Sequence, residues 1–246
     1  MIKALLLLLS AGKLGKVFLT GGTMLLSVFA YALIYGWWYA VGFVLLIFVH
    51  EMGHYLAARQ RGLNVGAPTF IPFVGAWVEL KDMPHDVETE AYIGIAGPFV
   101  GTLGALLCYF LARNYDNNLL LALSYAGFFI NLFNLIPLSP FDGGRITAII
   151  SPRMWFAGVP ILVGLFFVMP SPMLILIGLL AAPQVMKAWH YDPNAPENAA
   201  YYGVPLRTKV EYAFYYLLLL GFLAVMANDV HEMLKAVHAV KGGEAV

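Results

Sequence analysis

An apolar stretch from Val17 to Ala58 constrains the fold more than any other feature of the sequence. A membrane-spanning helix needs about 20 residues to cross a hydrocarbon layer of about 30 Å. The stretch is too long for one such crossing and long enough for two. Within it, Tyr35-Gly36-Trp37-Trp38 combines a helix breaker with aromatic residues that favour a membrane surface. We therefore expect a helical hairpin that turns at this tetrapeptide.

The composition indicates that the whole chain, and not only this stretch, belongs in a membrane. Hydrophobic residues make up 61% of the sequence, charged residues 11%, and the mean hydropathy is +0.78. Soluble domains carry far more charge than this. The 14 basic and 14 acidic residues leave no net charge that would attract nucleic acid. The single Cys108 excludes a disulfide framework and a cysteine-rich zinc module.

Further apolar segments complete the predicted fold, an all-α polytopic membrane protein with six or seven transmembrane helices. The third segment has four glycines spaced for close helix packing, and the next ends in a stretch broken by prolines and a glycine pair. Two segments parted by Pro170-Ser171-Pro172 are near the minimum length for a span and predict a helical hairpin. After the first two crossings, the segments are 91–112, 119–137, 155–169, 173–186 and 210–227.

The segment that follows the second helix is too interrupted by proline and glycine to be helical, and its residues favour strands. We expect a short membrane-associated β-hairpin, with strands at Phe70-Ile71, Phe73-Val74 and residues 77–80, split by Gly75. The hairpin lies either on the surface or between helices, since irregular backbone is tolerated at depth where it lines a cavity.

Basic residues predict the orientation of the chain, because cytoplasmic flanks gather lysine and arginine. With the N-terminus inside, three basic residues fall outside: Arg113, Lys235 and Lys241. The cytoplasmic side would then carry Lys3, Lys13, Lys16, Arg59, Arg61, Lys81, Arg145, Arg153, Lys187, Arg207 and Lys209.

The second predicted helix contains the sequence His50-Glu51-Met52-Gly53-His54, an H-E-x-x-H motif. Residues four apart lie on one face of a helix, so both imidazoles can reach one metal ion. Glu51 lies about 100° round the helix and can act on a water molecule at that ion. The pattern is typical of metalloproteases.

A catalytic zinc ion usually has three protein ligands, so a further donor is required. Asp142 is the best candidate because it lies between apolar segments, whereas Glu79, Glu88 and Glu90 lie in polar ones. Burying an ionised aspartate in a bilayer costs about 2.5–3.5 kcal/mol, and zinc binding in peptide sites releases about 10–16 kcal/mol. Zinc binding would therefore outweigh the cost.

Two alternatives to a metal site remain open from these residues. The polar groups of the motif could line a packed bundle or a proton pathway, which would make the protein a non-enzymatic transporter or ion relay. Asp142 alone could cap the next helix. An inactive protease-like scaffold is a third possibility, although an intact Glu51 argues against it.

Together, the two motifs resemble the site-2 protease family of intramembrane zinc metalloproteases. The first is the H-E-x-x-H sequence, and the second is Asn134-x-x-Pro137 followed by Asp142-Gly143, similar to N-x-x-P-x-x-x-x-D-G. Ala96-Gly97-Pro98 and the predicted β-hairpin add to the resemblance, which covers about residues 17–153. The sequence contains no inserted PDZ domain and no CBS pair, so the resemblance is to minimal members.

The resemblance implies a set of roles. His50, His54 and Asp142 would hold one Zn²⁺ per chain, Glu51 would be the catalytic base, and Asn134 would contact substrate. The substrate would be a transmembrane protein or peptide within the lipid bilayer, with a separate regulatory or adaptor protein as a further partner. The protein would be a multi-pass protein of a prokaryotic inner membrane, with its active site near the cytoplasmic side.

The predicted organisation has four parts. An interfacial segment at residues 1–16, with a cleaved signal as the alternative, precedes a catalytic membrane core at 17–153. C-terminal transmembrane helices at 154–228 include a polar connector at 187–209, and a polar tail follows at 229–246.

Overall fold

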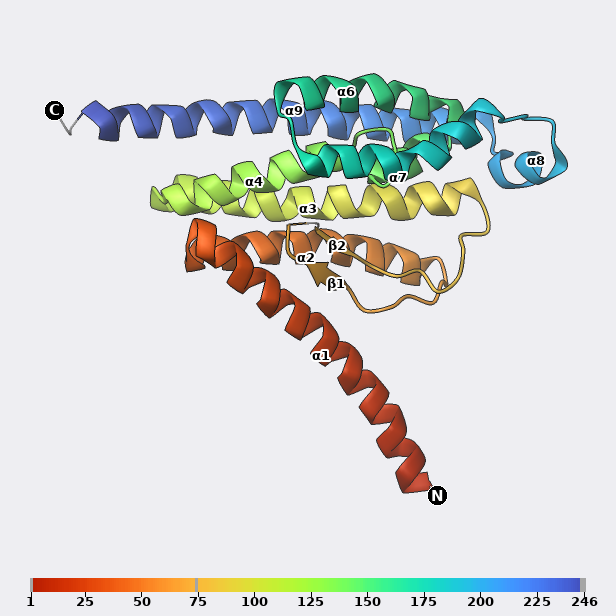
Figure 1. Ribbon diagram of the computed structural model, residues 1–246, viewed down its shortest axis with the longest axis horizontal. Coiled ribbons are helices and arrows are strands. Elements are labelled where there is room, and N and C mark those ends of the chain that lie inside the picture. Colours follow the sequence, from red (N-terminus) through yellow and green to blue (C-terminus); the bar gives the residue numbers. More distant parts are fainter. Residues whose placement is uncertain (1, 74, 244–246) are drawn as a thin grey trace.

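The computed structural model describes residues 2–73 and 75–243, and most of them are helical (Figure 1). The two strands are β1 (Thr69–Ile71) and β2 (Gly75–Trp77). The helices are α1 (Ile2–Tyr35), α2 (Trp37–Gln60), α3 (Val87–Tyr115), α4 (Asn118–Asn134), α5 (Asp142–Thr147), the 3₁₀ helix η1 (Pro152–Ala157), α6 (Gly158–Val168), α7 (Pro172–Trp189), α8 (Pro196–Tyr202) and α9 (Leu206–Gly243).

The long helices lie side by side in a layered bundle. α3 packs against α2 on one side and α4 on the other, and α4 also packs along α9 (Figure 1). The C-terminal part of α1 packs on α2, and the N-terminal part of α1 diverges from the bundle. α3 is therefore the central element of the bundle.

The predicted helical hairpin is present and turns at Gly36. This glycine lies between α1 and α2 and has a φ of 83°, a backbone conformation that residues with a Cβ atom rarely adopt. α1 runs without a break from Ile2 to Tyr35, so no structural boundary separates 1–16 from the span that follows. The interfacial position of residues 1–16 stays a prediction.

The predicted close packing of the third span is confirmed, because the glycines of α3 lie directly against neighbouring elements. A Cβ on Gly101 would come within 2.3 Å of Asn131 on α4, and one on Gly104 would meet Val49 on α2 at 3.2 Å. On the facing helix, a Cβ on Gly53 would lie 2.3 Å from the Ala96 carbonyl oxygen. The backbones of α2 and α3 therefore approach as closely as small residues allow.

The predicted β-hairpin is present, but its strands begin earlier in the sequence than expected. Gly75 opens β2 instead of separating two strands, and Phe73 lies in the turn with a φ of 64°. Val74, expected in a strand, lies outside the described residues. Phe70 pairs with Ala76 in the antiparallel register.

The hairpin is attached to α1 by three hydrogen bonds. Thr20 Oγ1 donates to the Pro68 carbonyl at 2.7 Å, and the Phe70 amide donates to Thr23 Oγ1 at 3.3 Å. The Phe73 amide donates to the Tyr31 hydroxyl at 3.1 Å. Phe70 is buried against Tyr31. The hairpin therefore packs on helices instead of projecting as a free loop.

The C-terminal part also differs from the prediction at its boundaries. The hairpin predicted at 155–169 and 173–186 is present as η1, α6 and α7. α9 continues from Leu206 to Gly243, so no break separates the last apolar segment from the tail expected at 229–246. α8 lies within the predicted polar connector, and α4 ends at Asn134 instead of residue 137 because Pro137 cannot continue the helix.

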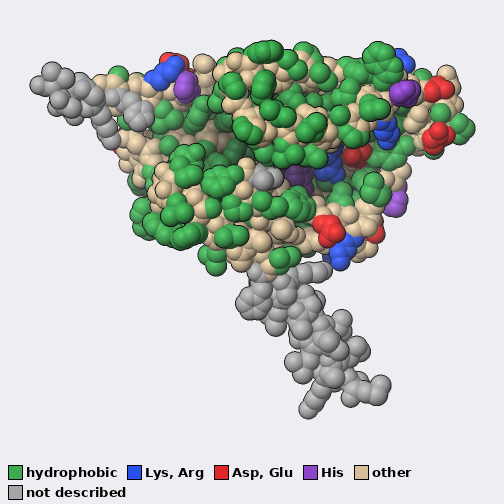
Figure 2. Space-filling view, in the orientation of Figure 1, with side chains coloured by type: hydrophobic (Ala, Val, Ile, Leu, Met, Phe, Trp, Pro, Cys, Tyr) green, Lys and Arg blue, Asp and Glu red, His purple; other side chains and the backbone are tan. Residues whose placement is uncertain are grey.

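In the part of the chain that the structure describes, four helical segments are long and apolar enough to cross a membrane: Trp37–Gln60, Val87–Tyr115, Pro172–Trp189 and Leu206–Val237. Three further apolar helical segments are shorter: Leu19–Tyr35, Asn118–Asn134 and Pro152–Val168. Hydrophobic side chains cover much of the face shown in Figure 2, as expected for a surface in contact with lipid. The fold is therefore that of an integral membrane protein, with six or seven spans as the predicted number.

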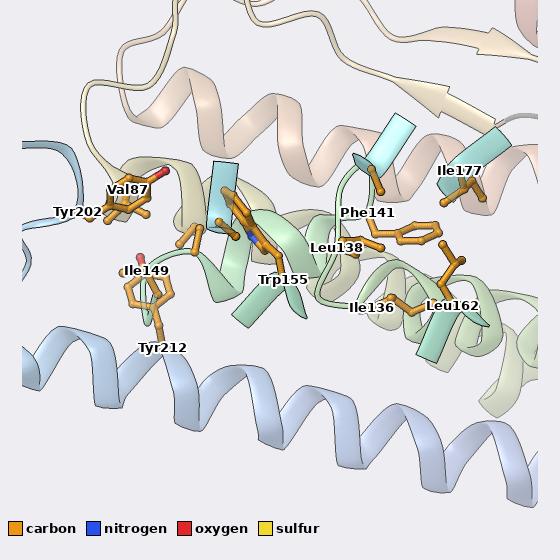
Figure 3. Packing of buried hydrophobic residues seen from close by; sticks show 14 residues of the cluster. Val87, Ile136, Leu138, Phe141, Ile149, Trp155, Leu162, Ile177, Tyr202 and Tyr212 are labelled. Atoms are coloured by element: carbon orange, nitrogen blue, oxygen red, sulfur yellow. The ribbon is translucent and has the colours of Figure 1, made fainter. Parts of the chain in front are cut away.

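A large cluster of buried hydrophobic residues surrounds the segment that leads to Asp142. Trp155 lies at its centre, with Phe141, Leu138 and Leu162 on one side (Figure 3). Residues from α3, α8 and α9 lie on the other side, including Tyr212. The segment before α5 is thereby enclosed by the C-terminal helices.

The contact between α2 and α3 can be tested at Gly53. In Gly53→Ala the new methyl group would meet the Ala96 carbonyl oxygen, and we expect a loss of about 1–3 kcal/mol in stability, typical of overpacking. Thermal unfolding of the detergent-solubilised protein measures the effect. Gly164→Ala in α6 is the control, because no atom lies within 4 Å of a Cβ there. Equal melting temperatures for the two variants would contradict the close contact.

Candidate metal centre

Three buried side chains from two distant parts of the sequence meet at one point. His50 Nε2 lies 3.2 Å from Asp142 Oδ2, and His54 Nε2 lies 3.2 Å from Asp142 Oδ1. The two Nε2 atoms are 3.1 Å apart. Among the residues that the structure describes, this is the one group of three or more His, Cys, Asp and Glu side chains placed to hold a metal ion.

His54 is oriented by the backbone of α3. Its Nδ1 lies 2.7 Å from the Ile93 carbonyl oxygen, which can only accept a hydrogen bond. Nδ1 therefore carries the proton, and Nε2 presents a lone pair toward Asp142. Gly97 makes room for the ring, because a Cβ there would lie 2.2 Å from His54 Nε2.

Asp142 is the first residue of α5, and the loop before it is held by side chains from the C-terminal half of the chain. The Tyr216 hydroxyl of α9 donates to the Leu135 carbonyl at 2.6 Å. Gln184 of α7 accepts from the Ser139 amide at 2.5 Å, and Trp155 Nε1 donates to the Gly144 carbonyl at 2.7 Å. These three hydrogen bonds attach the start and the middle of the loop, and the first turn of α5, to other helices.

Two glycines after Asp142 would allow backbone to come close to an ion, but Gly143 and Gly144 lie against protein backbone. A Cβ on Gly143 would lie 2.2 Å from the Leu135 carbonyl oxygen, and one on Gly144 would lie 2.7 Å from the Leu138 carbonyl carbon. The glycines therefore let α5 pack against the backbone that follows α4.

Glu51 follows His50 on the next face of α2 and is only 6% exposed. Within the described part of the chain, no hydrogen bond or ion pair involves its carboxylate. A buried carboxylate beside metal-binding groups, with its oxygens uncommitted, is placed to exchange a proton with a bound water or substrate.

The other acidic residues considered as ligands do not join the group. Glu88 lies 3.7 Å from Arg61. Glu90 lies 3.8 Å from Arg145 and accepts a hydrogen bond of 2.6 Å from the Tyr201 hydroxyl. Burial and this bond to a carboxylate raise the pKa of Tyr201, so the hydroxyl stays protonated as a donor. Glu90 thus links α3 to α5 and α8.

Of the two asparagines near the C-terminal end of α4, Asn131 and Asn134, the one with no predicted role contacts the site. Asn131 Oδ1 lies 2.7 Å from His50 Nδ1, and Asn131 is 3% exposed. Asn134, predicted to contact substrate, donates from Nδ2 to the Ile130 carbonyl of its own helix at 3.1 Å. An asparagine in an apolar segment needs a hydrogen-bond partner for its amide, which is the one sequence signal that could have identified Asn131. Only the packing of α4 on α2 shows that the partner is His50.

The donor set fits a tetrahedral cation. Ligand distances of about 2.0–2.2 Å place pairs of donors about 3.3 Å apart around a tetrahedral zinc ion. The two Nε2 atoms are 3.1 Å apart, and each lies 3.2 Å from one of the two carboxylate oxygens of Asp142. Two imidazoles and one carboxylate also form the ligand set of several catalytic zinc sites, which keep a fourth position open.

A recess on the molecular surface exposes polar groups in this region. Histidine, basic and acidic side chains are visible together between the β-hairpin and α7 (Figure 2). A separate cavity of about 690 Å³ lies between α2, α3 and α9. It is lined by apolar side chains and by the face of α2 that carries Gly53 and Leu56, away from Glu51.

Comparison with known proteins gives matches in the part of the chain that carries the histidines. Residues 38–116 match the model of peptidase family M50. The chain is 35% identical over 124 residues to the zinc metalloprotease MJ0392 of Methanocaldococcus jannaschii, covering 47% of this chain and 36% of that protein. It is 36% identical over 67 residues to the probable chloroplastic zinc metalloprotease EGY1 of Arabidopsis thaliana, covering 25% of this chain and 12% of that protein.

A solved structure, the site-2 protease from Methanocaldococcus jannaschii, aligns with a TM-score of 0.44 and 24% identity, covering 69% of this chain and 87% of that one. The chain spans little more than a third of the length of MJ0392 and about an eighth of the length of EGY1. The family match includes His50, Glu51 and His54, whereas Asp142 lies beyond it. The family model and the zinc metalloprotease relatives confirm the resemblance predicted from the motifs, and the chain is similar to peptidase family M50 over residues 38–116.

Proposed function

We propose that the protein is an intramembrane zinc metalloendopeptidase that hydrolyses peptide bonds in transmembrane segments of membrane proteins. The observation that carries this proposal is the convergence of His50, His54 and Asp142 next to the uncommitted carboxylate of Glu51. His50, Glu51 and His54 lie on α2, a helix long and apolar enough to cross a membrane. The match to family M50 and the names of the zinc metalloprotease relatives support the same assignment.

In this proposal His50, His54 and Asp142 bind one zinc ion per chain. The ion would supply Lewis acidity to the substrate carbonyl and to the attacking water. Glu51 would accept a proton from that water and deliver it to the leaving amine. The apolar surroundings of the site exclude bulk water and strengthen the electrostatic interactions of these groups.

Asn134 remains the proposed substrate contact. Its Nδ2 is bound to its own helix, so its Oδ1 is the atom able to accept a hydrogen bond from a substrate amide. The side chain is partly buried and lies at the last residue of α4.

We place the site near the cytoplasmic side of a prokaryotic inner membrane, because most basic residues flank the ends of the spans on that side. The substrate would be a transmembrane protein or peptide, and a separate regulatory or adaptor protein remains a predicted partner.

A substrate helix must unwind before its carbonyl groups can be attacked, and β2 offers a way to hold the unwound segment. Phe70 donates to Thr23 on α1, so the amide of Phe70 points away from β2. Its antiparallel partner Ala76 then directs its own amide away from β1. An extended substrate could pair with this edge and satisfy its backbone hydrogen bonds there.

Substitutions of Glu51 and His54 should affect zinc binding and substrate cleavage differently. Glu51→Gln keeps the metal-binding groups, so we expect about one zinc per chain and at least a 10²-fold loss of cleavage. His54→Ala should lose both zinc and cleavage. Zinc content of purified protein and cleavage of a model transmembrane substrate in proteoliposomes measure the two effects.

If wild-type protein purifies without zinc and binds none when zinc is added, the protease assignment is wrong. An ion relay, the competing function, would instead show ion flux across proteoliposomes that depends on Glu51 and no cleavage.

Strand pairing can be tested at Ala76. Ala76→Pro removes the outward amide while leaving the bonds to β1, because proline is tolerated on an outer strand edge. We expect cleavage of a transmembrane substrate to fall at least tenfold, with unchanged zinc content. Ala76→Val keeps the amide and serves as the matched control. Unchanged cleavage by a folded Ala76→Pro protein would show that substrate does not pair with β2.

A further inference from the structure

We propose that Asn131 is a positioning residue that fixes the tautomer and the ring orientation of His50, so that His50 Nε2 is directed at the metal. The inference rests on the proposed metal-binding role of His50. It assigns a function to a side chain that belongs to neither motif of the sequence.

The orientation of the Asn131 amide follows from its contact with its own helix. Asn131 Nδ2 lies 2.7 Å from the Gly127 carbonyl oxygen. A carbonyl oxygen can only accept, so the NH₂ group must face Gly127 and the Oδ1 atom must face His50. The amide therefore cannot be flipped without placing two acceptors in contact.

The protonation of His50 follows from that orientation. Asn131 Oδ1 is an acceptor 2.7 Å from His50 Nδ1, so Nδ1 must carry a proton. In the neutral ring, Nε2 is then the atom with the lone pair, and it lies 3.2 Å from Asp142 and 3.1 Å from His54 Nε2. This is the tautomer that a metal ion at the shared point requires.

The packing of α3 prevents Asn131 from adopting another position. A Cβ on Gly101 would lie 2.3 Å from Asn131 Oδ1, so the amide is held directly against the α3 backbone. It is buried with both of its polar atoms bonded, which leaves no group free to turn toward solvent. A fully bonded buried amide of this kind has one stable arrangement.

The two histidines are therefore oriented by different means. His54 donates to a backbone carbonyl of α3, a contact that survives any side-chain substitution. His50 depends on one side chain of α4. Asn131 is therefore the position at which a substitution would release one ligand and leave the other in place.

The test is the zinc affinity of three variants, measured by chelator competition in detergent. Asn131→Leu removes the acceptor, and we expect zinc to bind about 10- to 100-fold more weakly, as for other groups that orient metal ligands. Asn131→Asp keeps an acceptor for His50 Nδ1 and should bind zinc more tightly than Asn131→Leu. Ser124→Ala is the control, since Ser124 is buried on α4 and bonds only within its helix, and it should match the wild type.

Wild-type zinc affinity in a folded Asn131→Leu protein would overturn the proposal, as would an Asp variant no better than the Leu variant. The protonation state of His50 Nδ1 is a second measurement, and an amide with only a structural role would not determine it. Nitrogen NMR of histidine-labelled, metal-free wild-type protein should show His50 protonated at Nδ1, with His50→Gln used for assignment. A His50 ring without a proton on Nδ1 overturns the proposal even if Asn131→Leu fails to fold. Absence of zinc binding in the wild type would instead refute the proposed function.

Discussion

The site depends on the approach of two imidazole nitrogens and one carboxylate inside a hydrophobic bundle. The two Nε2 atoms lie 3.1 Å apart, and those of His50 and His54 lie 3.2 Å from Asp142 Oδ2 and Oδ1, respectively. Lone pairs at such distances repel unless a cation or a proton lies between them, and an apolar environment strengthens that repulsion. His54 is held by the backbone of α3 and its ring occupies space that a Cβ on Gly97 would fill. The close contact of α2 with α3 is thus a condition for the arrangement of the metal-binding groups.

The C-terminal helices contribute to the site without carrying any of its donors. Tyr216, Gln184 and Trp155 each donate to or accept from the backbone between Leu135 and Gly144. Such a loop has many backbone groups without helical partners, and leaving them unpaired in an apolar interior would be costly. These side chains both satisfy the loop and orient Asp142 toward α2.

Much of the fold could be predicted because its signals are local. Gly36 between aromatic residues marks the turn of the first hairpin, and Pro137 stops α4. The spacing of His50 and His54 places both imidazoles on one helix face whatever surrounds the helix. Boundaries were harder to predict: α9 passes through the expected start of the tail at residue 229, and β2 begins at Gly75, because helix continuation and strand register are set by packing partners.

The sequence by itself determined that the chain is a membrane protein, that His50, Glu51 and His54 share a helix, and that Asp142 is the best third donor. The first two follow from residue type and short-range spacing within single elements, and the third from the apolar segments that flank Asp142. Only the tertiary structure decided that Asn131 contacts His50 and that the glycines after Asp142 face protein backbone. Those contacts join residues far apart in the chain, and their partners are selected by how helices pack, which spacing within one helix does not specify.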